Sequence, residues 1–151
     1  MKQPILICYD GSAEAERAVD TAAALLAPRE AVVLEVEPAI AFAESMAATV
    51  SPVPGGAFEA LNRAEALRLA EVGAERARRA GLRAEARGEV ASTTWQGIVD
   101  VADELDAAAI VIGSRGLHGL PELASGSVSH DVATHARRPV LIVPPTRSSA
   151  A

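Results

Sequence analysis

Residues 107–132 read AAAIVIGSRGLHGLPELASGSVSHDV and join an apolar run to a glycine-rich loop. The run AAAIVI has no polar residue and is short, which is typical of a strand buried on both faces of a parallel sheet. After the loop, residues 127–136 are predicted to form a helix. A strand, a loop and a helix in this order predict one unit of an open α/β sheet.

The same alternation runs through the rest of the chain. Ile5 to Tyr9 forms a buried strand, and Ser12 caps a helix that stops at Pro28. Further strands are predicted at 31–36, 82–90 and 140–143, and further helices at 58–80 and from residue 95, with Thr94 as its cap. The apolar stripe of the long helix comprises Ala66, Leu69, Ala70, Ala77 and Ala80.

Right-handed crossovers of these lengths require a mainly parallel sheet. The predicted fold is therefore α/β, a single-domain open five-stranded parallel sheet with helices on both faces. The domain spans residues 1–146, with a variable loop at 38–57 and a tail at 147–151. Prolines, glycines and the lack of a clear period mark that loop.

The amino-acid composition and the net charge argue against some classes of partner. Of the 151 residues 50% are hydrophobic but only 3% are aromatic, which favours thin, closely packed layers of helix on sheet. The formal net charge of −6 argues against nucleic acid as a partner. With one cysteine, no cleavable signal pattern and no apolar run near 20 residues, the sequence predicts a cytoplasmic protein and no membrane partner.

Two loops carry polar and glycine signals at the places where open parallel sheets bind ligands, beyond the carboxyl ends of the strands. Asp10 ends the first strand directly before a helix, where it suits a ribose hydroxyl or a nucleotide-bound metal ion. The alternative interpretation is a plain turn with an N-cap. Gly113 and Gly116 allow close backbone approach, and Gly126-Ser127 begins a helix whose free amides suit an anion.

The spacing G-x-x-G, nine residues, then G-S resembles the ATP-binding signature of the universal stress protein family. The segments ILICYDGSAEAERAVDTAAALL, WQGIVDVADELDAAAIVIGSRG and GSVSHDVATHARRPVLIVP resemble that family's segments in the same order. The resemblance covers nearly the whole chain outside residues 38–57. It implies a Rossmann-like fold of the adenine nucleotide alpha hydrolase-like type, and ATP as the ligand.

The resemblance also implies roles for single residues. Asp10 would approach the ribose, the phosphates or Mg²⁺, and the backbone of Val36 would meet adenine. Arg115 is a candidate to offset phosphate charge, with a solvated surface arginine as the equal alternative. The complete predicted ATP-binding set is Cys8, Asp10, Ser12, Val36, Ile112, Gly113, Arg115, Gly116, Gly126, Ser127 and Val128.

Other reactive residue types favour structural roles. Cys8 lies inside a strand and is assigned to packing near the nucleotide. His118, His130 and His135 show no zinc-ligand spacing, and no G-x-S-x-G elbow is present to expose a nucleophile. Trp95 falls on an apolar helix stripe, which favours packing over base stacking.

The leading hypothesis is an ATP-binding universal stress protein that acts as a nucleotide-dependent switch, with at most slow ATP hydrolysis. The alternatives are a dimeric scaffold of the same fold that binds no nucleotide, and a slow ATPase or adenylating enzyme. Residues 140–143 form an apolar edge strand, and in the family the last strand commonly pairs with its twin. We therefore expect a homodimer through Val140 to Val143.

Overall fold

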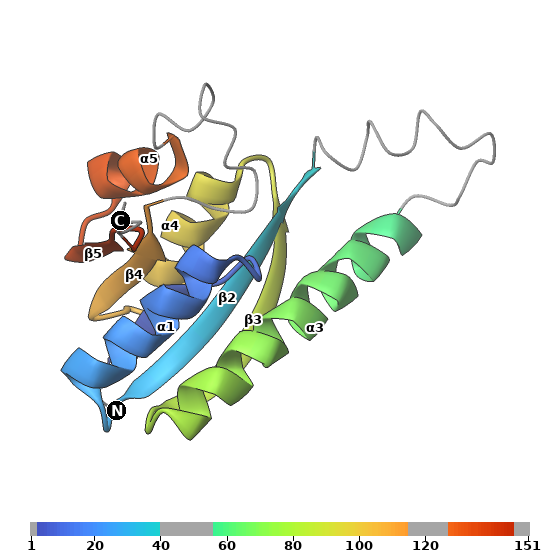
Figure 1. Cartoon of the computed structure of the whole chain (residues 1–151). Coiled ribbons are helices and arrows are strands. Elements are labelled where there is room, and N and C mark those ends of the chain that lie inside the picture. Colours follow the sequence, from blue (N-terminus) through green and yellow to red (C-terminus); the bar gives the residue numbers. More distant parts are fainter. Residues whose placement is uncertain (1–2, 40–55, 115–126, 147–151) are drawn as a thin grey trace, which may run out of the picture.

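The computed structural model describes residues 3–39, 56–114 and 127–146. They form one parallel sheet in the order β3-β2-β1-β4-β5 (Figure 1). The predicted fold class is thereby confirmed. The elements are β1 (Ile5–Cys8), α1 (Ala13–Leu26), β2 (Glu30–Pro38), α3 (Ala57–Arg79), β3 (Arg83–Ala91), α4 (Thr94–Glu104), β4 (Ala109–Gly113), α5 (Ser127–His135) and β5 (Val140–Val143).

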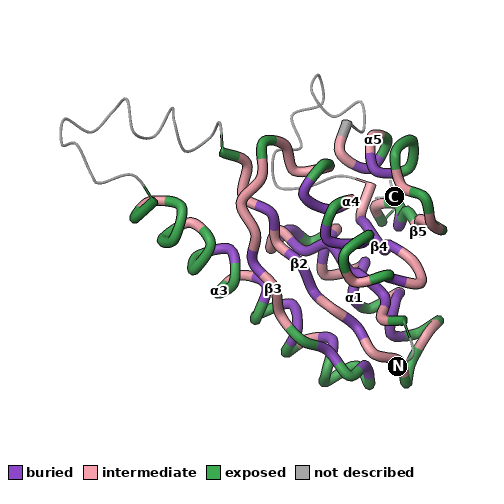
Figure 2. The backbone as a smooth tube through the Cα atoms, turned by 180° about the vertical axis from the view of Figure 1, so that it is seen from behind, coloured by how far each residue is buried: buried purple, intermediate pink, exposed green. Residues whose placement is uncertain are grey.

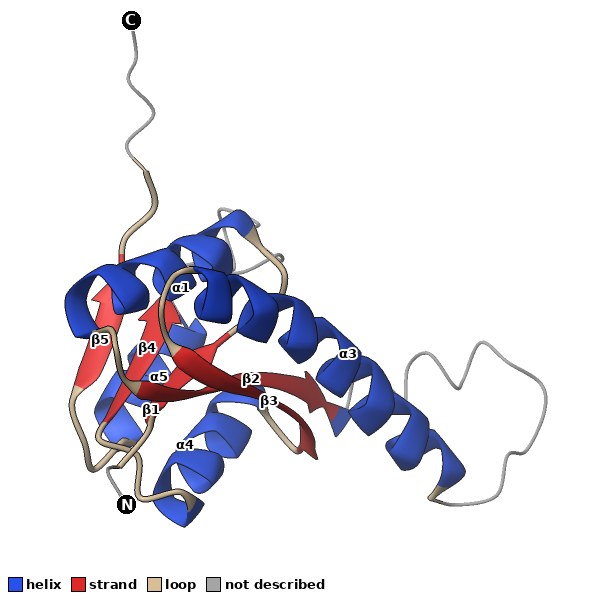
Figure 3. Ribbon diagram, turned by 90° about the horizontal axis from the view of Figure 1, so that it is seen from below, coloured by secondary structure: helices blue, strands red, loops and turns tan. Residues whose placement is uncertain are grey.

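Two hydrophobic clusters lie on the two faces of this sheet. One cluster holds α1 and α3 against one face, and the other holds α4 and α5 against the opposite face (Figure 3). All four residues of β1 are buried, with Leu6 and Ile7 fully inaccessible. A strand with neighbours on both sides and helices on both faces must be apolar at every position, which explains the run ILIC.

Helix α1 begins as its sequence predicts. The Oγ atom of Ser12 accepts a hydrogen bond from the backbone N–H of Ala15 at 3.1 Å, so Ser12 is the N-cap. Helix α4 differs from the prediction by one residue, because Thr93 rather than Thr94 is its cap. Thr93 has the extended backbone that a cap requires, whereas Thr94 already has helical geometry.

Helix α3 approaches the sheet through very small residues. Gly73 packs against the ring of Tyr9, where an added Cβ would lie 2.6 Å from Cγ. An added Cβ on Gly88 of β3 would lie 2.6 Å from the carbonyl oxygen of Arg63 and nearer still to the backbone nitrogen of Leu67. The buried stripe of α3 is Ala66, Ala70, Gly73, Ala74 and Ala77.

The predicted stripe of α3 was wrong at Ala80, which is exposed at the end of the helix. There the chain leaves the helix through Gly81, whose φ of 103° is left-handed, while the N–H of Leu82 donates to the carbonyl of Ala77 at 3.0 Å. At the other end, the first turns of α3 are largely exposed (Figure 2).

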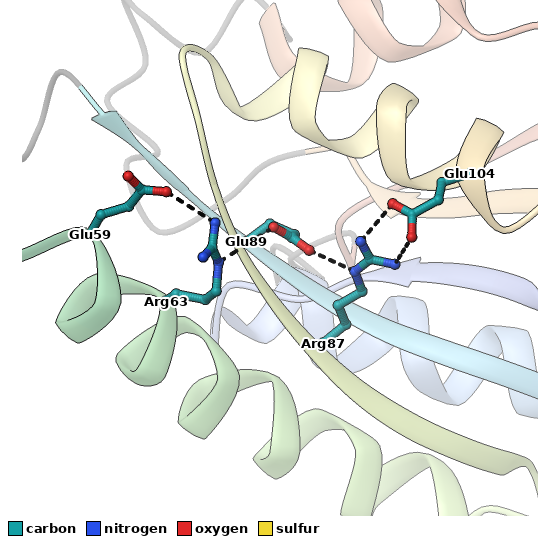
Figure 4. A network of polar contacts seen from close by, with 5 residues as sticks. All are labelled: Glu59, Arg63, Arg87, Glu89 and Glu104. Atoms are coloured by element: carbon teal, nitrogen blue, oxygen red, sulfur yellow. Dashed lines mark hydrogen bonds and ion pairs between the residues drawn. The ribbon is translucent and has the colours of Figure 1, made fainter. Parts of the chain in front are cut away.

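Ion pairs link α3, β3 and α4 around the outer edge of the sheet. Arg87 of β3 donates to Glu89 at 2.7 Å and to both carboxylate oxygens of Glu104 on α4 (Figure 4). Arg63 of α3 lies 3.7 Å from the same Glu89 and also pairs with Glu59. Because α3 and α4 cover opposite faces, this chain of charges passes around β3, which is the edge strand with charges that its sequence predicts.

The described ranges end close to the predicted variable segments. Strand β2 extends to Pro38 and α3 starts at Ala57, so only the ends of the predicted loop 38–57 are described. Most of that loop and the tail 147–151 lie outside the described residues. None of the helices in the described ranges has the length and apolar character that a membrane crossing needs.

Replacement of Gly88 by alanine tests the close contact of α3 with β3. We expect Gly88→Ala to lower the free energy of unfolding by about 1–3 kcal/mol or more, because the new methyl group meets helix backbone that cannot rotate away. Urea denaturation measures the change. Glu85→Ala, an exposed position on the same strand, is the matched control and should change stability far less. Equal effects of the two substitutions would contradict this packing.

Candidate functional site

Predicted site residues from three strands meet at the carboxyl end of the sheet. The strand pairing puts Cys8 beside Leu34 of β2. The pairing of Ile7 with Val111, continued by one residue, puts Ile112 on the other side of Cys8. Cys8 and Ile112 belong to the same buried cluster, on the face covered by α4 and α5. The structure therefore brings these two predicted residues together.

The next row toward the carboxyl end contains polar groups. Since side chains alternate between faces, the residues two positions further along each strand return to the same face. Two positions beyond Leu34, Cys8 and Ile112 come Val36, Asp10 and Ser114; the pairing of β1 with β2 ends at Cys8 and Leu34, so Asp10 lies in the turn after the strand. A carboxylate and a hydroxyl thus follow directly on the apolar row of Cys8 and Ile112.

The turn after β1 fixes the position of Asp10. Its Oδ1 atom accepts a hydrogen bond from the backbone N–H of Ser12 at 2.9 Å, and Gly11 between them has a left-handed φ of 79°. The side chain of Ser12 is buried and caps α1, so its hydroxyl is engaged by the helix. The turn with an N-cap is therefore confirmed, and the structure shows a carboxylate at the strand end. The role of Asp10 toward a ribose hydroxyl or a metal ion stays a prediction.

Val36 has its side chain in the core and its backbone near β1. The side chain packs where α4 begins, 2.6 Å from the position that a Cβ on Gly97 would take. On the other side, β1 pairs with β2 only as far as Cys8 and Leu34, after which the N–H of Tyr9 donates to the Leu34 carbonyl at 2.9 Å. Val36 is two residues further along β2, so its backbone N–H and C=O groups face the same side as those of Leu34. At this level β1 has already ended.

Cys8 is a buried, unreactive thiol. Burial raises its pKa, and the carboxylates of Glu35 and Asp10 raise it further. Because the thiolate is the reactive form, a cysteine held as a thiol is a poor nucleophile. The structure agrees with the packing role predicted for it.

A side chain at Gly113 would face α1. A Cβ there would come within 3.1 Å of the Cβ and the carbonyl oxygen of Glu14 on α1. A tight contact with α1 is therefore sufficient reason for a small residue at this position. The backbone of Gly113 ends β4, where it pairs with Val143 of β5.

The remaining predicted residues lie around α5 or outside the described ranges. Val128 is half-buried against the cluster that contains Cys8, and Ser127 is the first residue of α5. Arg115, Gly116 and Gly126 lie outside the described residues, as does His118. Helix α5 connects β4 to the parallel strand β5, so its N-terminus lies at the carboxyl end of the sheet, with its free amides on that side.

One of the candidate histidines packs against the single tryptophan of the chain. Within residues 3–39, 56–114 and 127–146, no three side chains of His, Cys, Asp or Glu are grouped so that they could hold a metal ion. The ring of His135 stacks on Trp95 with 4.3 Å between centroids, and this contact joins α5 to α4. Trp95 also packs against the cluster beneath these helices, in agreement with the prediction.

Sequence reasoning missed Glu35, a carboxyl group inside the otherwise apolar run of β2. It lies one position before Val36 and therefore on the other face of the sheet. Burial raises its pKa to about 8, with further contributions from Asp10 and Glu37. A carboxylate within the pattern AVVLEVEP was the signal that pointed to it.

The raised pKa of Glu35 predicts a pH-dependent stability. The folded state keeps a proton that the unfolded chain releases near pH 4.5, so this group's favourable contribution is lost as pH rises from there toward 8. Glu35→Gln keeps the neutral form at every pH. Its stability relative to wild type should therefore increase between about pH 5 and 8 and level off above.

Urea denaturation of wild type and Glu35→Gln at pH 5, 7 and 9 measures this dependence. Glu85→Gln, which removes an exposed carboxylate from β3, serves as the control. A difference between Glu35→Gln and wild type that stays constant from pH 5 to 9 would show that Glu35 ionises normally.

Comparisons with known proteins agree with this architecture. The family model for the universal stress protein family matches residues 1–144. The chain is 33% identical to "Universal stress protein YxiE" of Bacillus subtilis (strain 168), over 95% of this chain and 99% of that protein. A universal stress protein structure from Archaeoglobus fulgidus has a TM-score of 0.67 at 30% identity, covering 94% of this chain and 93% of the other.

A further solved structure, a universal stress protein in complex with cAMP, has a TM-score of 0.63 at 28% identity and covers 94% of this chain and 96% of the other. The family model covers nearly all of the sequence, and the match with the curated relative covers 95% of it. The order of strands, the apolar β1 and the capped turn at Asp10 belong to one continuous match. The chain is a member of the universal stress protein family.

Proposed function

We propose that this protein binds ATP together with Mg²⁺ and acts as a nucleotide-dependent switch in a stress response. The observation that carries the proposal is the carboxyl end of β1, where the Asp10 carboxylate follows the buried Cys8 and β1 is flanked by β2 and β4. Ligands of open parallel sheets bind at this end. Membership of the family, in which one similar protein is in complex with cAMP, makes an adenine nucleotide the leading ligand.

Each part of the nucleotide has a counterpart in the chain. We assign adenine to the backbone of Val36, which faces the space beyond β1, and the nucleoside to the apolar pair Cys8 and Ile112; the strand pairing and the shared cluster support this assignment. The Asp10 carboxylate suits ribose hydroxyls or a metal ion. The N-terminus of α5 suits phosphate, because its amide groups are free and its dipole is positive there.

The phosphate loop itself is assigned from its sequence motif. Gly116 and Gly126 lie outside the described residues, and with Ser127 they match the family's spacing. Arg115 next to Gly116 is proposed to offset phosphate charge. In a chain with a net charge of −6, Mg²⁺ would supply positive charge to the phosphates, with Asp10 as its protein contact.

A switch rather than a fast enzyme fits the chemistry of the site. Among the described residues around the end of β1, the Cys8 thiol is protonated and buried, and the Ser12 hydroxyl is engaged as a helix cap. Neither group can act as an activated nucleophile. We therefore propose that any ATP hydrolysis is slow and that the bound nucleotide itself is the signal. The cytoplasm, where ATP and Mg²⁺ are available, is the proposed compartment.

Nucleotide binding is tested by what the purified protein carries. We expect mass spectrometry of denatured protein, purified without added nucleotide, to release an adenine nucleotide, and calorimetric titration to detect MgATP binding. Gly116→Val should lose most of this affinity, because a branched side chain would fill the space needed for close backbone approach. Gly119→Val, a substitution in the same loop but outside the motif, is the matched control.

If wild type neither retains nucleotide nor binds MgATP, the protein is a scaffold of the same fold. Equal loss of affinity in Gly116→Val and Gly119→Val would remove the motif from the explanation. Circular dichroism of both variants shows whether the fold is intact in each case.

We also propose that two copies associate through β5. The sheet has two edges, and they differ in charge. The edge strand β3 carries Arg83, Glu85, Arg87 and Glu89, and charged residues discourage strand pairing. The edge strand β5 reads VLIV, and its Ile142 is 40% exposed. An apolar edge with open backbone groups can be covered by the same strand of a second copy around a two-fold axis.

A charge at Ile142 tests this association. Ile142→Arg should convert the dimer to a monomer, because the substitution places two arginines in one apolar contact. Light scattering after gel filtration measures the mass in solution. Val72→Arg on α3 is the control, since Val72 is equally apolar and 52% exposed but distant from β5 in the sheet order. A dimer that persists in Ile142→Arg would exclude this interface.

A further inference from the structure

Helix α3 contacts both neighbours of Asp10 in the chain. An added Cβ on Gly11 would lie 3.1 Å from Cδ1 of Leu69, 3.8 Å from its Cδ2 and 3.9 Å from its Cγ. One helical turn further along α3, Gly73 lies against the ring of Tyr9. Residues four positions apart project from the same side of a helix, so both contacts belong to one face of α3. This face therefore packs on the residues before and after Asp10.

Gly11 is the most flexible point of the turn that carries Asp10. Its φ of 79° is left-handed, and a residue without a side chain has more conformational freedom than any other. The hydrogen bond of the turn spans Gly11, since the N–H of Ser12 donates to Oδ1 of Asp10 at 2.9 Å. Gly11 has no side chain that could anchor it in the core. The side chain of Leu69 occupies the adjoining space and opposes movement of the turn.

An ion pair holds α3 beside α1 close to these contacts. Arg76 of α3 donates to both carboxylate oxygens of Asp20 at 2.8 Å, and its Nη1 atom lies 3.6 Å from Glu16. The two helices cover the same face of the sheet (Figure 3). A bidentate pair fixes the geometry of its two partners more closely than a single hydrogen bond does. Leu69 is thus presented to Gly11 from a helix that is itself held in place.

We propose that Leu69 is a positioning residue of the nucleotide site: by packing on Gly11 it holds the turn, so that the Asp10 carboxylate keeps one orientation toward the ligand. This inference rests on the proposed nucleotide binding and adds to it a residue that acts through Asp10. A group that is already oriented loses less conformational freedom on binding than one on a mobile turn. Leu69 lies on α3, far in the sequence from the glycine motif.

The substitution Leu69→Ala tests this role. It removes the side chain that packs on Gly11, so the turn gains freedom, and MgATP affinity measured by calorimetric titration should fall about ten-fold. Leu69→Met keeps the volume and should retain nearly the affinity of wild type. Leu26→Ala is the matched control: it removes the same atoms from a half-buried leucine that packs on the same cluster at the other end of α1, and it should leave affinity unchanged.

A double-mutant cycle with Asp10→Asn separates positioning from a general loss of packing. If Leu69 acts through Asp10, adding Leu69→Ala to Asp10→Asn should lower the affinity by less than about two-fold more, whereas independent effects would multiply. Hydrogen exchange followed by NMR supplies a measurement that needs no ligand. The Ser12 amide should exchange faster in nucleotide-free Leu69→Ala and keep the rate of wild type in Leu26→Ala.

The outcomes separate this inference from the proposed function. If wild type binds MgATP and Leu69→Ala binds it equally well, the inference is wrong while nucleotide binding stands. Equal losses in Leu69→Ala and Leu26→Ala, or a full further loss on top of Asp10→Asn, would also overturn it, because Leu69 would then be ordinary core packing. An unchanged exchange rate at Ser12 in Leu69→Ala would contradict the hold on the turn. If wild type binds no nucleotide, the proposed function fails, and the positioning role fails with it.

Discussion

The pairing of β1 between β2 and β4 is the constraint on which the rest of the structure depends. Four buried residues, ILIC, make hydrogen bonds to strands on both sides and lie beneath helices on both faces. Because all three strands are parallel, their carboxyl ends meet at one edge of the sheet. The end of β1, the middle of β2 around Leu34 and the end of β4 are brought together by this register, although they are far apart in the sequence.

Small residues set the distances between the layers. With 3% aromatic residues, the chain fills its core mainly with alanine, valine, leucine and isoleucine. Gly73 lies against Tyr9, and Gly88 receives the backbone of α3. Close packing of this kind leaves little freedom for a helix to shift, since added volume is costly in a dense interior. The sheet is thus a rigid support for a site built from loops and strand ends.

Charge is distributed so that each part of the surface has a different role. The edge at β3 carries alternating charges and is joined to α3 and α4 by ion pairs. The edge at β5 is apolar. Near the carboxyl end of the sheet, Glu35 is held partly in its neutral form, because burial and the nearby Asp10 carboxylate both oppose the charged form. An acidic protein that binds an anion benefits when its carboxyl groups near the site are few, neutral or matched to a metal ion.

The sequence by itself determined the succession of strands and helices along the chain, the parallel sheet, the cap at Ser12 and the family. Apolar runs, turn residues and glycine spacing are local signals, and the sequence displays them directly. It did not determine that Thr93 caps α4, that Ala80 is exposed or that Gly73 contacts the ring of Tyr9. Those outcomes depend on where each helix meets the sheet.

Only the tertiary structure decided which residues share a row, because strand register is a relation between distant segments. It placed Ile112 beside Cys8, gave Glu35 its raised pKa and turned Gly113 toward α1.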